Sequence, residues 1–192
     1  MLYLPDLEDA AFLFIANCRI IVLYSRCVTT KPDTGIKPRK GKKNGMFREM
    51  RRKKNEISID MAKQLLASSR RGVLAVNGDD GYPYAIPVNY LYDDKAQRIY
   101  FHGAKIGHKV DALRACDKVC FTVYGNETVR TESWAPFMQS VVVFGRCHLM
   151  DAGSETTRHL KQFAMKYYPS EQLVDEEIAH AGKAVQVFEI EI

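Results

Sequence analysis

The pattern of apolar and polar residues divides the chain into short strands and a few amphipathic helices. β-Branched and aromatic residues that alternate with polar ones, or cluster between turn residues, are typical of strands. They predict strands at 73–76, 82–92, 98–102, 118–124, 137–150 and 184–192. Apolar residues three and four positions apart predict one helix after Ser58, a second after Ser154 and a third across 171–181, and both serines are suitable helix caps.

Turn residues separate these strands, and the helices stand apart from them. Asn77–Gly81 is a turn signal, because Asn, Asp and Gly tolerate positive φ angles. Strands with short connections and separate helices predict an α+β fold, an antiparallel split β-barrel with flanking helices. The strand 137–150 is apolar on both faces at Val141–Phe144, which is expected where a barrel wall also meets another subunit.

The stretch from Gly81 to Leu113 holds the candidate chemistry. Prolines at 83 and 87 mark the strand 82–92 as an exposed or bulged edge, and we expect a hairpin with the strand 98–102. The strand 98–102 stops at Gly103, and four residues then open a helical pattern: Lys105, Gly107, His108 and Lys109. Free N–H groups at a helix start beside cations favour a phosphate. A solvated basic face is the alternative that this spacing leaves open.

Charge does not change this picture. The chain has 192 residues, of which 46% are hydrophobic, enough for one core. It has 28 basic and 23 acidic residues. Eight of the basic and four of the acidic residues lie in 1–45, so 46–192 has 20 basic and 19 acidic residues and is nearly neutral. The basic cluster at 48–54 has no interleaved aromatic residues, so we expect no nucleic-acid partner.

The first 45 residues fit no targeting signal. The apolar run Ala10–Tyr24 follows acidic residues and is shorter than the roughly 18 to 20 residues that span a bilayer, so we expect neither export nor a membrane partner. Residues 29–45 are typical of a flexible linker. The five cysteines form no CxxC pair and no metal-type cluster, which favours a reducing cytoplasm and no metal site.

Four segments together carry a family resemblance. YPYAIPVNYLYDD and IYFHGAKIGHKVDAL, with MFREMRRKK upstream and SVVVFGRCHLM downstream, resemble the nitroimidazole-resistance flavoproteins of the pyridoxamine 5′-phosphate oxidase-like, FMN-binding split-barrel superfamily. The resemblance covers Met46–Ile192. It implies a domain at 46–192, and a leader or linker at 1–45 that is disordered or precedes the true start.

The resemblance also implies a site. FMN would lie at a homodimer interface, with its phosphate at the turn of Lys105 to Lys109, best matched by His108 and Lys109. The flavin ring would lie along the strand 82–92, at Pro87, Val88, Asn89 and Tyr90. Ser140 would reach the flavin from the long strand 137–150. His102, followed by Gly103, would stand beside the ring, either as the proton donor to a reduced substrate or only as a hydrogen-bond partner of the flavin.

The function implied is reduction of a small electrophile, such as a nitroaromatic of the 5-nitroimidazole type, by an FMN-dependent oxidoreductase. Candidate walls of the substrate pocket are Trp134, Phe137 and Met138. A flavin-binding redox or sensor protein without catalysis is the alternative, because one barrel fold hosts several functions.

Overall fold

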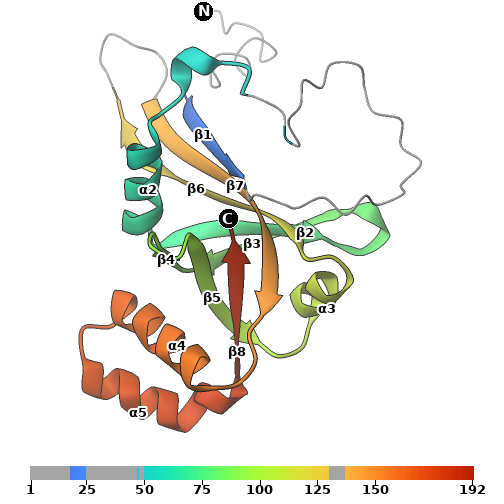
Figure 1. Cartoon of the computed structure of the whole chain (residues 1–192), viewed down its shortest axis with the longest axis vertical. Helices are drawn as coiled ribbons and strands as arrows, with labels where there is room; N and C mark the ends of the chain where they lie inside the picture. Colours follow the sequence, from blue (N-terminus) through green and yellow to red (C-terminus); the bar gives the residue numbers. More distant parts are fainter. Residues whose placement is uncertain (1–17, 25–46, 48–49, 130–136) are drawn as a thin grey trace, which may run out of the picture.

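The structure of the chain, a computed structural model, describes residues 18–24, 47, 50–129 and 137–192, the first range by its backbone alone (Figure 1). Its strands are β1 (Cys18–Tyr24), β2 (Arg71–Asn77), β3 (Pro83–Asn89), β4 (Leu91–Asp93), β5 (Arg98–Ala104), β6 (Lys118–Thr128), β7 (Phe137–Leu149) and β8 (Val185–Glu191). Its α-helices are α2 (Ile59–Ser68), α3 (His108–Ala115), α4 (Ser154–Tyr167) and α5 (Glu171–Ala181). Short 3₁₀ turns lie at Lys53–Asn55, Asp79–Gly81 and Gly182–Ala184.

The sheet curls because its two ends are consecutive in the chain. Its strand order is β3-β2-β6-β7-β8-β5-β4, and all neighbours in this order pair antiparallel. β3 and β4 stand at opposite ends of the order, yet only Tyr90 separates them. A chain bend thus joins the two ends of the sheet, and the result is an α+β split barrel. This confirms the predicted fold class.

The bend at Tyr90 divides the strand that we predict at 82–92. Tyr90 is fully buried, and its hydroxyl donates to the carbonyl of Leu66 on α2 (2.6 Å). The expected hairpin with the next strand is formed by β4 and β5 alone. β3 pairs instead with β2 across the predicted turn, where Asp80 and Gly81 have positive φ angles of 53° and 80°.

The long strand β7 divides one of its edges between two partners. β6 pairs along the other edge, whereas β8 pairs with Arg146–Leu149 and β1 runs parallel to 138–144. Gly145 lies where the two partners meet, and a Cβ added there would be 2.7 Å from Ile190 Cγ2, so this position requires glycine. The sequence pattern does not predict β1, and the expected leader therefore contains a strand of the sheet.

Side chains fill the barrel interior. Phe101 and Phe188 stack face to face with ring centroids 4.7 Å apart, and Phe121 meets the ring of Tyr90 edge-on at 4.9 Å. Leu65 of α2 belongs to the same core, and Ser58 caps this helix as predicted, since its hydroxyl accepts from the N–H of Met61 (3.2 Å). A small barrel packed in this way has room for a ligand only at its ends and outer surface.

The helices pack around the sheet, with α4 and α5 side by side at one end of the molecule (Figure 1). No helix in the described ranges is both long and apolar enough to cross a bilayer. Cys116, Cys120 and Cys147 are free thiols. Among residues 50–129 and 137–192 no three His, Cys, Asp or Glu side chains gather as metal ligands would.

Candidate functional site

Lys109 turns back over the end of β5. A Cβ added at Gly103 would lie 2.5 Å from Lys109 Nζ, so the ammonium occupies the space that glycine leaves free. The same nitrogen lies 4.9 Å from the ring centroid of Phe188 and 5.5 Å from that of Phe101. Lys109 is half-buried, and this burial lowers its pKa. No carboxylate of the described residues pairs with it, so this is a partly desolvated cation without a counter-ion, which favours an anionic ligand.

The other basic residues of this turn lie in different directions. The ring of His108 stacks on Tyr84, with centroids 4.2 Å apart, and its Nε2 is 3.5 Å from Asp79 Oδ2. Lys105 lines a cavity together with Lys183, near the start of β8. The predicted phosphate cluster therefore separates in space, and only Lys109 lies over the end of β5.

His102 lies on the opposite face of β5 from Lys109. Neighbouring residues in a strand point to opposite faces. The His102 ring meets Phe163 of α4 at 89°, with centroids 4.7 Å apart, and lines a cavity of about 650 Å³ between α4 and α5. Partial burial, and then the charge of Lys109, lower the pKa of His102. The imidazole is thus neutral near pH 7, and can donate one N–H hydrogen bond.

The outer edge of β3 is open in the described residues, since β2 pairs with its other edge. Pro87 and Asn89 are exposed, whereas Val88 packs against the core. Pro87 has no N–H, so a ligand along this edge meets fewer donors than an ordinary strand offers. That a flat ring lies along this edge stays a prediction.

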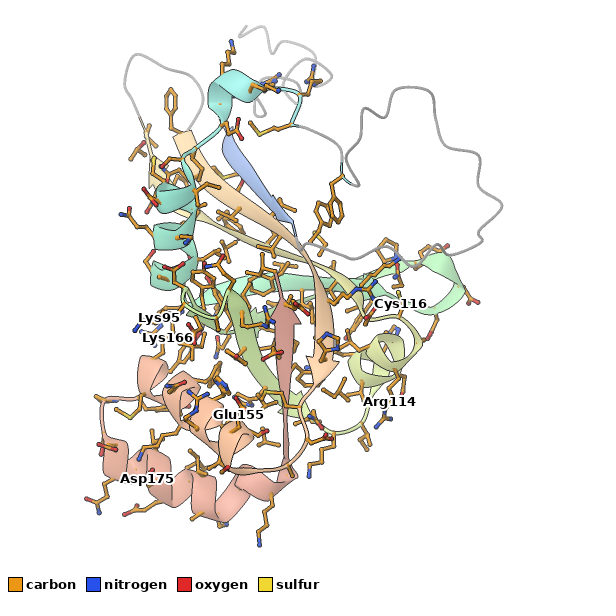
Figure 2. The ribbon with its side chains drawn as sticks, in the orientation of Figure 1. Lys95, Arg114, Cys116, Glu155, Lys166 and Asp175 are labelled. Atoms are coloured by element: carbon orange, nitrogen blue, oxygen red, sulfur yellow. The ribbon has the colours of Figure 1, made fainter. Side chains whose placement is uncertain are left out.

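The backbone of Tyr90 is not free to contact a flavin ring as the prediction has it. Its N–H donates to Tyr167 Oη (2.8 Å), and its carbonyl accepts from Lys166 Nζ (3.1 Å) and lies 2.8 Å from the same hydroxyl. Lys166 also donates to the carbonyl of Ser69 (2.7 Å), and burial lowers its pKa to about 8. Figure 2 shows Lys166 at the end of α4 that approaches β4. Tyr90 is therefore a structural joint between α2, α4 and the barrel, and its backbone groups are already occupied.

Replacing Tyr167 with phenylalanine is expected to lower the free energy of unfolding by about 1 to 3 kcal/mol, because the N–H of Tyr90 loses its partner. Urea titration followed by circular dichroism measures the change. Tyr168→Phe is the matched control, since Tyr168 is exposed and its change should stay within about 0.5 kcal/mol. Equal effects of the two substitutions would contradict this role of Tyr167.

The remaining predicted residues lie at the other end of β7. Phe137 and Met138 are half-buried at its start, and Ser140 is buried near them. β5 and His102 lie beside the opposite end, and a strand as long as β7 spans roughly 40 Å at about 3.3 Å per residue. Trp134 lies outside the described residues. Of the predicted cofactor residues, Ser140 thus lies beside the predicted pocket walls, whereas His102 and Gly103 lie beside the other end of β7.

The family is decided by a comparison of the sequence with family profiles. Residues 58–192 match the profile described as Pyridoxamine 5′-phosphate oxidase. The chain belongs to the pyridoxamine 5′-phosphate oxidase family. This is a flavin-related redox family, and the predicted resemblance is confirmed at that level. Among curated proteins, none matches the sequence significantly.

Three solved structures share the fold. A candidate 5-nitroimidazole antibiotic resistance protein from Bacteroides thetaiotaomicron superposes with a TM-score of 0.56 at 17% identity, over 69% of this chain and 78% of that one. A conserved hypothetical protein from Mycobacterium tuberculosis has a TM-score of 0.56 at 21% identity, over 70% and 79%. A flavocytochrome from Azotobacter vinelandii has a TM-score of 0.55 at 18% identity, over 70% and 64%.

This member of the pyridoxamine 5′-phosphate oxidase family also buries a histidine, His159, against the outer face of β5. The ring stacks on Tyr100 with centroids 3.9 Å apart. Its Nε2 lies 2.9 Å from Arg158 Nη2, and its buried Nδ1 has no hydrogen-bond partner. A guanidinium can only donate, so Nε2 accepts and the proton resides on Nδ1. Burial, and then the charge of Arg158, lower the pKa of His159.

The stability of the protein should therefore fall on acidification. A histidine with a lowered native pKa binds fewer protons in the native than in the unfolded state, so its contribution is complete above about pH 6.5 and is lost below it. We expect the melting temperature to drop between pH 7.5 and pH 5.5, and to drop less in His159→Phe, which retains the stack on Tyr100. His102 contributes in the same direction, so some decrease should remain.

Differential scanning calorimetry across this pH range tests the expectation. His148→Phe is the control, because His148 is exposed on β7 and its substitution should leave the wild-type pH dependence in place. A His159→Phe variant with the full wild-type decrease would contradict the assignment.

Proposed function

We propose that the protein is an FMN-dependent oxidoreductase that reduces a small electrophile, such as a nitroaromatic of the 5-nitroimidazole type. Membership of a flavin-related redox family supports the reaction class. The sequence resemblance and the name of the structural relative from Bacteroides thetaiotaomicron support the substrate class. The observation that carries the proposal is the half-buried ammonium of Lys109 over Gly103, without an acidic partner in the described residues.

The residues present fit an FMN phosphate. A dianion beside Lys109 Nζ would supply the counter-ion that the half-buried ammonium lacks, and charge-assisted hydrogen bonds are the strong ones. Gly103 carries no side chain, so a ligand can approach the strand end closely. The open edge of β3 at Pro87 and Asn89 can orient a flat ring. When bound, the flavin would supply the electron transfer between a reductant and the electrophile.

His102 is the predicted site residue that the structure separates from Lys109. Its ring meets Phe163 and lines the cavity between α4 and α5, on the opposite face of β5 from Lys109. A neutral imidazole is also a poor source of a proton compared with imidazolium. We therefore assign His102 no part in the proposed reaction.

We further propose that the working unit is a homodimer. Phe137, Met138 and Ser140 lie at one end of β7, whereas β5, which carries Gly103, pairs with β8 beside the other end. In a homodimer, β7 of one chain would reach the cofactor of the other, and Phe137 and Met138 would line its pocket.

The test is an anaerobic assay of the protein with FMN, a nitroaromatic, and NADH or NADPH as the reductant. We expect loss of the nitro absorbance well above the rate with free FMN, and a much smaller rate with Lys109→Met. FMN binding without turnover would support the alternative of a non-catalytic flavin-binding protein. Absence of FMN binding would contradict both functions.

A further inference from the structure

Two adjoining cavities lie where the helix pair α4–α5 meets the start of β8. Their volumes are about 430 and 650 Å³, and they share four lining residues: Leu160, Ile178, Gly182 and Val185. The two cavities therefore adjoin at these residues, and we call them together the hairpin groove. Each cavity lies in the size range of small-molecule sites, roughly 300 to 1,000 Å³. The hairpin groove is separate from Lys109, which lies on the opposite face of β5 from the cavity at His102.

The hairpin groove exists because α5 is attached mainly to α4. Lys161 of α4 forms ion pairs with Glu171 (2.8 Å) and Asp175 (2.7 Å) of α5, and Val174 is buried between the helices. Figure 2 shows Asp175 on α5, away from the barrel. α5 otherwise packs against the turn Gly182–Ala184 and little against the sheet. The space between α5 and the strand ends is therefore left open.

One part of the hairpin groove is mostly apolar and reaches the surface. Its walls include Phe163 and Ala164 from α4 and Leu173 from α5. Glu176 and Glu177 of α5 also line it, and their charges disfavour an acid group of the ligand in this part. Leu173 and Tyr168 are each 62% exposed at its opening. An apolar ligand would cover these side chains and remove their surface from water.

The other part of the hairpin groove carries positive charge. Lys105 and Lys183 line it, opposed by one carboxylate, Asp151. Neither lysine forms an ion pair with a carboxylate among the described residues, so both charges are available to a ligand. We propose that the hairpin groove binds a small amphipathic anion, an aromatic or aliphatic organic acid whose acid group lies at Lys105 and Lys183 and whose apolar body packs on Leu160, Phe163 and Ile178.

The test uses the full chain and 8-anilinonaphthalene-1-sulfonate, an aromatic anion whose fluorescence rises in apolar surroundings. We expect saturable binding of one probe per chain that saturating FMN leaves unchanged. Lys183→Glu should raise the dissociation constant about three- to tenfold, the range for an exposed charge contact that is reversed. The uncharged analogue N-phenyl-1-naphthylamine should bind Lys183→Glu and the wild type equally. Lys118→Glu, the same change at an exposed lysine on β6, should leave both affinities unchanged.

A second substitution tests the apolar part. Ala164→Trp places an indole in the cavity beside Phe163 and should weaken both probes more than tenfold. If a thermal melt shows that this variant does not fold, Leu173→Gln at the exposed opening replaces it, with a smaller loss expected for both probes. Competition by FMN, equal effects of Lys183→Glu and Lys118→Glu, or unchanged binding in the folded cavity variant would each overturn the proposal.

Discussion

Replacing Lys109 with methionine should raise the dissociation constant for FMN roughly tenfold to 150-fold, because a charge-assisted hydrogen bond contributes about 1.5 to 3 kcal/mol. Methionine retains an apolar stem over Phe101 and Phe188 and removes only the charge. Riboflavin, which lacks the phosphate, should bind the wild type more weakly than FMN and be little affected by the substitution. Quenching of flavin fluorescence measures all four affinities.

Lys118→Met, at an exposed lysine of β6, is the matched control and should retain wild-type FMN affinity. The stability of the protein without FMN supplies a second measurement. A half-buried ammonium that has no counter-ion is unfavourable, so Lys109→Met should unfold at the same urea concentration as the wild type or a higher one. A less stable variant whose FMN affinity is unchanged would show that Lys109 is structural, and would contradict the phosphate site.

Aspartate at Val143 of β7 should prevent folding, whereas aspartate at the adjacent Val142 should leave folding intact and weaken the dimer. Val143 is fully buried in the barrel core, so Val143→Asp places an unpaired carboxylate among apolar side chains and should cost more than about 4 kcal/mol, enough to prevent folding. Val142 is half-buried and lies outside that core, so Val142→Asp should fold. If β7 forms the proposed homodimer contact, Val142→Asp should be a monomer with weakened FMN binding.

Light scattering coupled to size exclusion measures the mass, and circular dichroism reports folding. Val142→Thr is the control, because it has nearly the same shape without a charge. A wild-type protein that is monomeric while loaded with flavin would contradict the homodimer, and so would a Val142→Asp variant that remains dimeric with full FMN affinity.

The strands and helices of the domain follow from local pattern, and that is why the sequence predicts most of them. The helix 171–181 is observed with the predicted bounds, and 118–124 and 137–150 are strands within a few residues. The break at Tyr90 is not local, because it depends on Leu66, Lys166 and Tyr167, which are distant in the sequence. The sequence pattern does not predict β1 either, because its partner β7 lies far along the chain and its apolar residues do not alternate with polar ones.

The site was harder to predict because closeness in sequence is not closeness in space. His108 and Lys109 are consecutive in α3, and consecutive helical residues do not face each other. His102 and Gly103 are consecutive in β5, where neighbours point to opposite faces. Of the basic residues clustered in the sequence, only Lys109 is therefore a candidate phosphate ligand in the structure. Lys105 and His108 lie at other parts of the molecule.

The shared edge of β7 also constrains the order in which the barrel can be completed during synthesis. β1 is made first, yet its partner residues start at Met138, so it must wait about 6 to 25 s at roughly 5 to 20 residues per second before pairing is possible. β8, the other partner of that edge, is made last among the described strands. The earliest and latest of the described strands meet at Gly145, so the wall closes only when translation has delivered both. Until β8 is made, the edge of Arg146–Leu149 leaves its backbone groups unpaired.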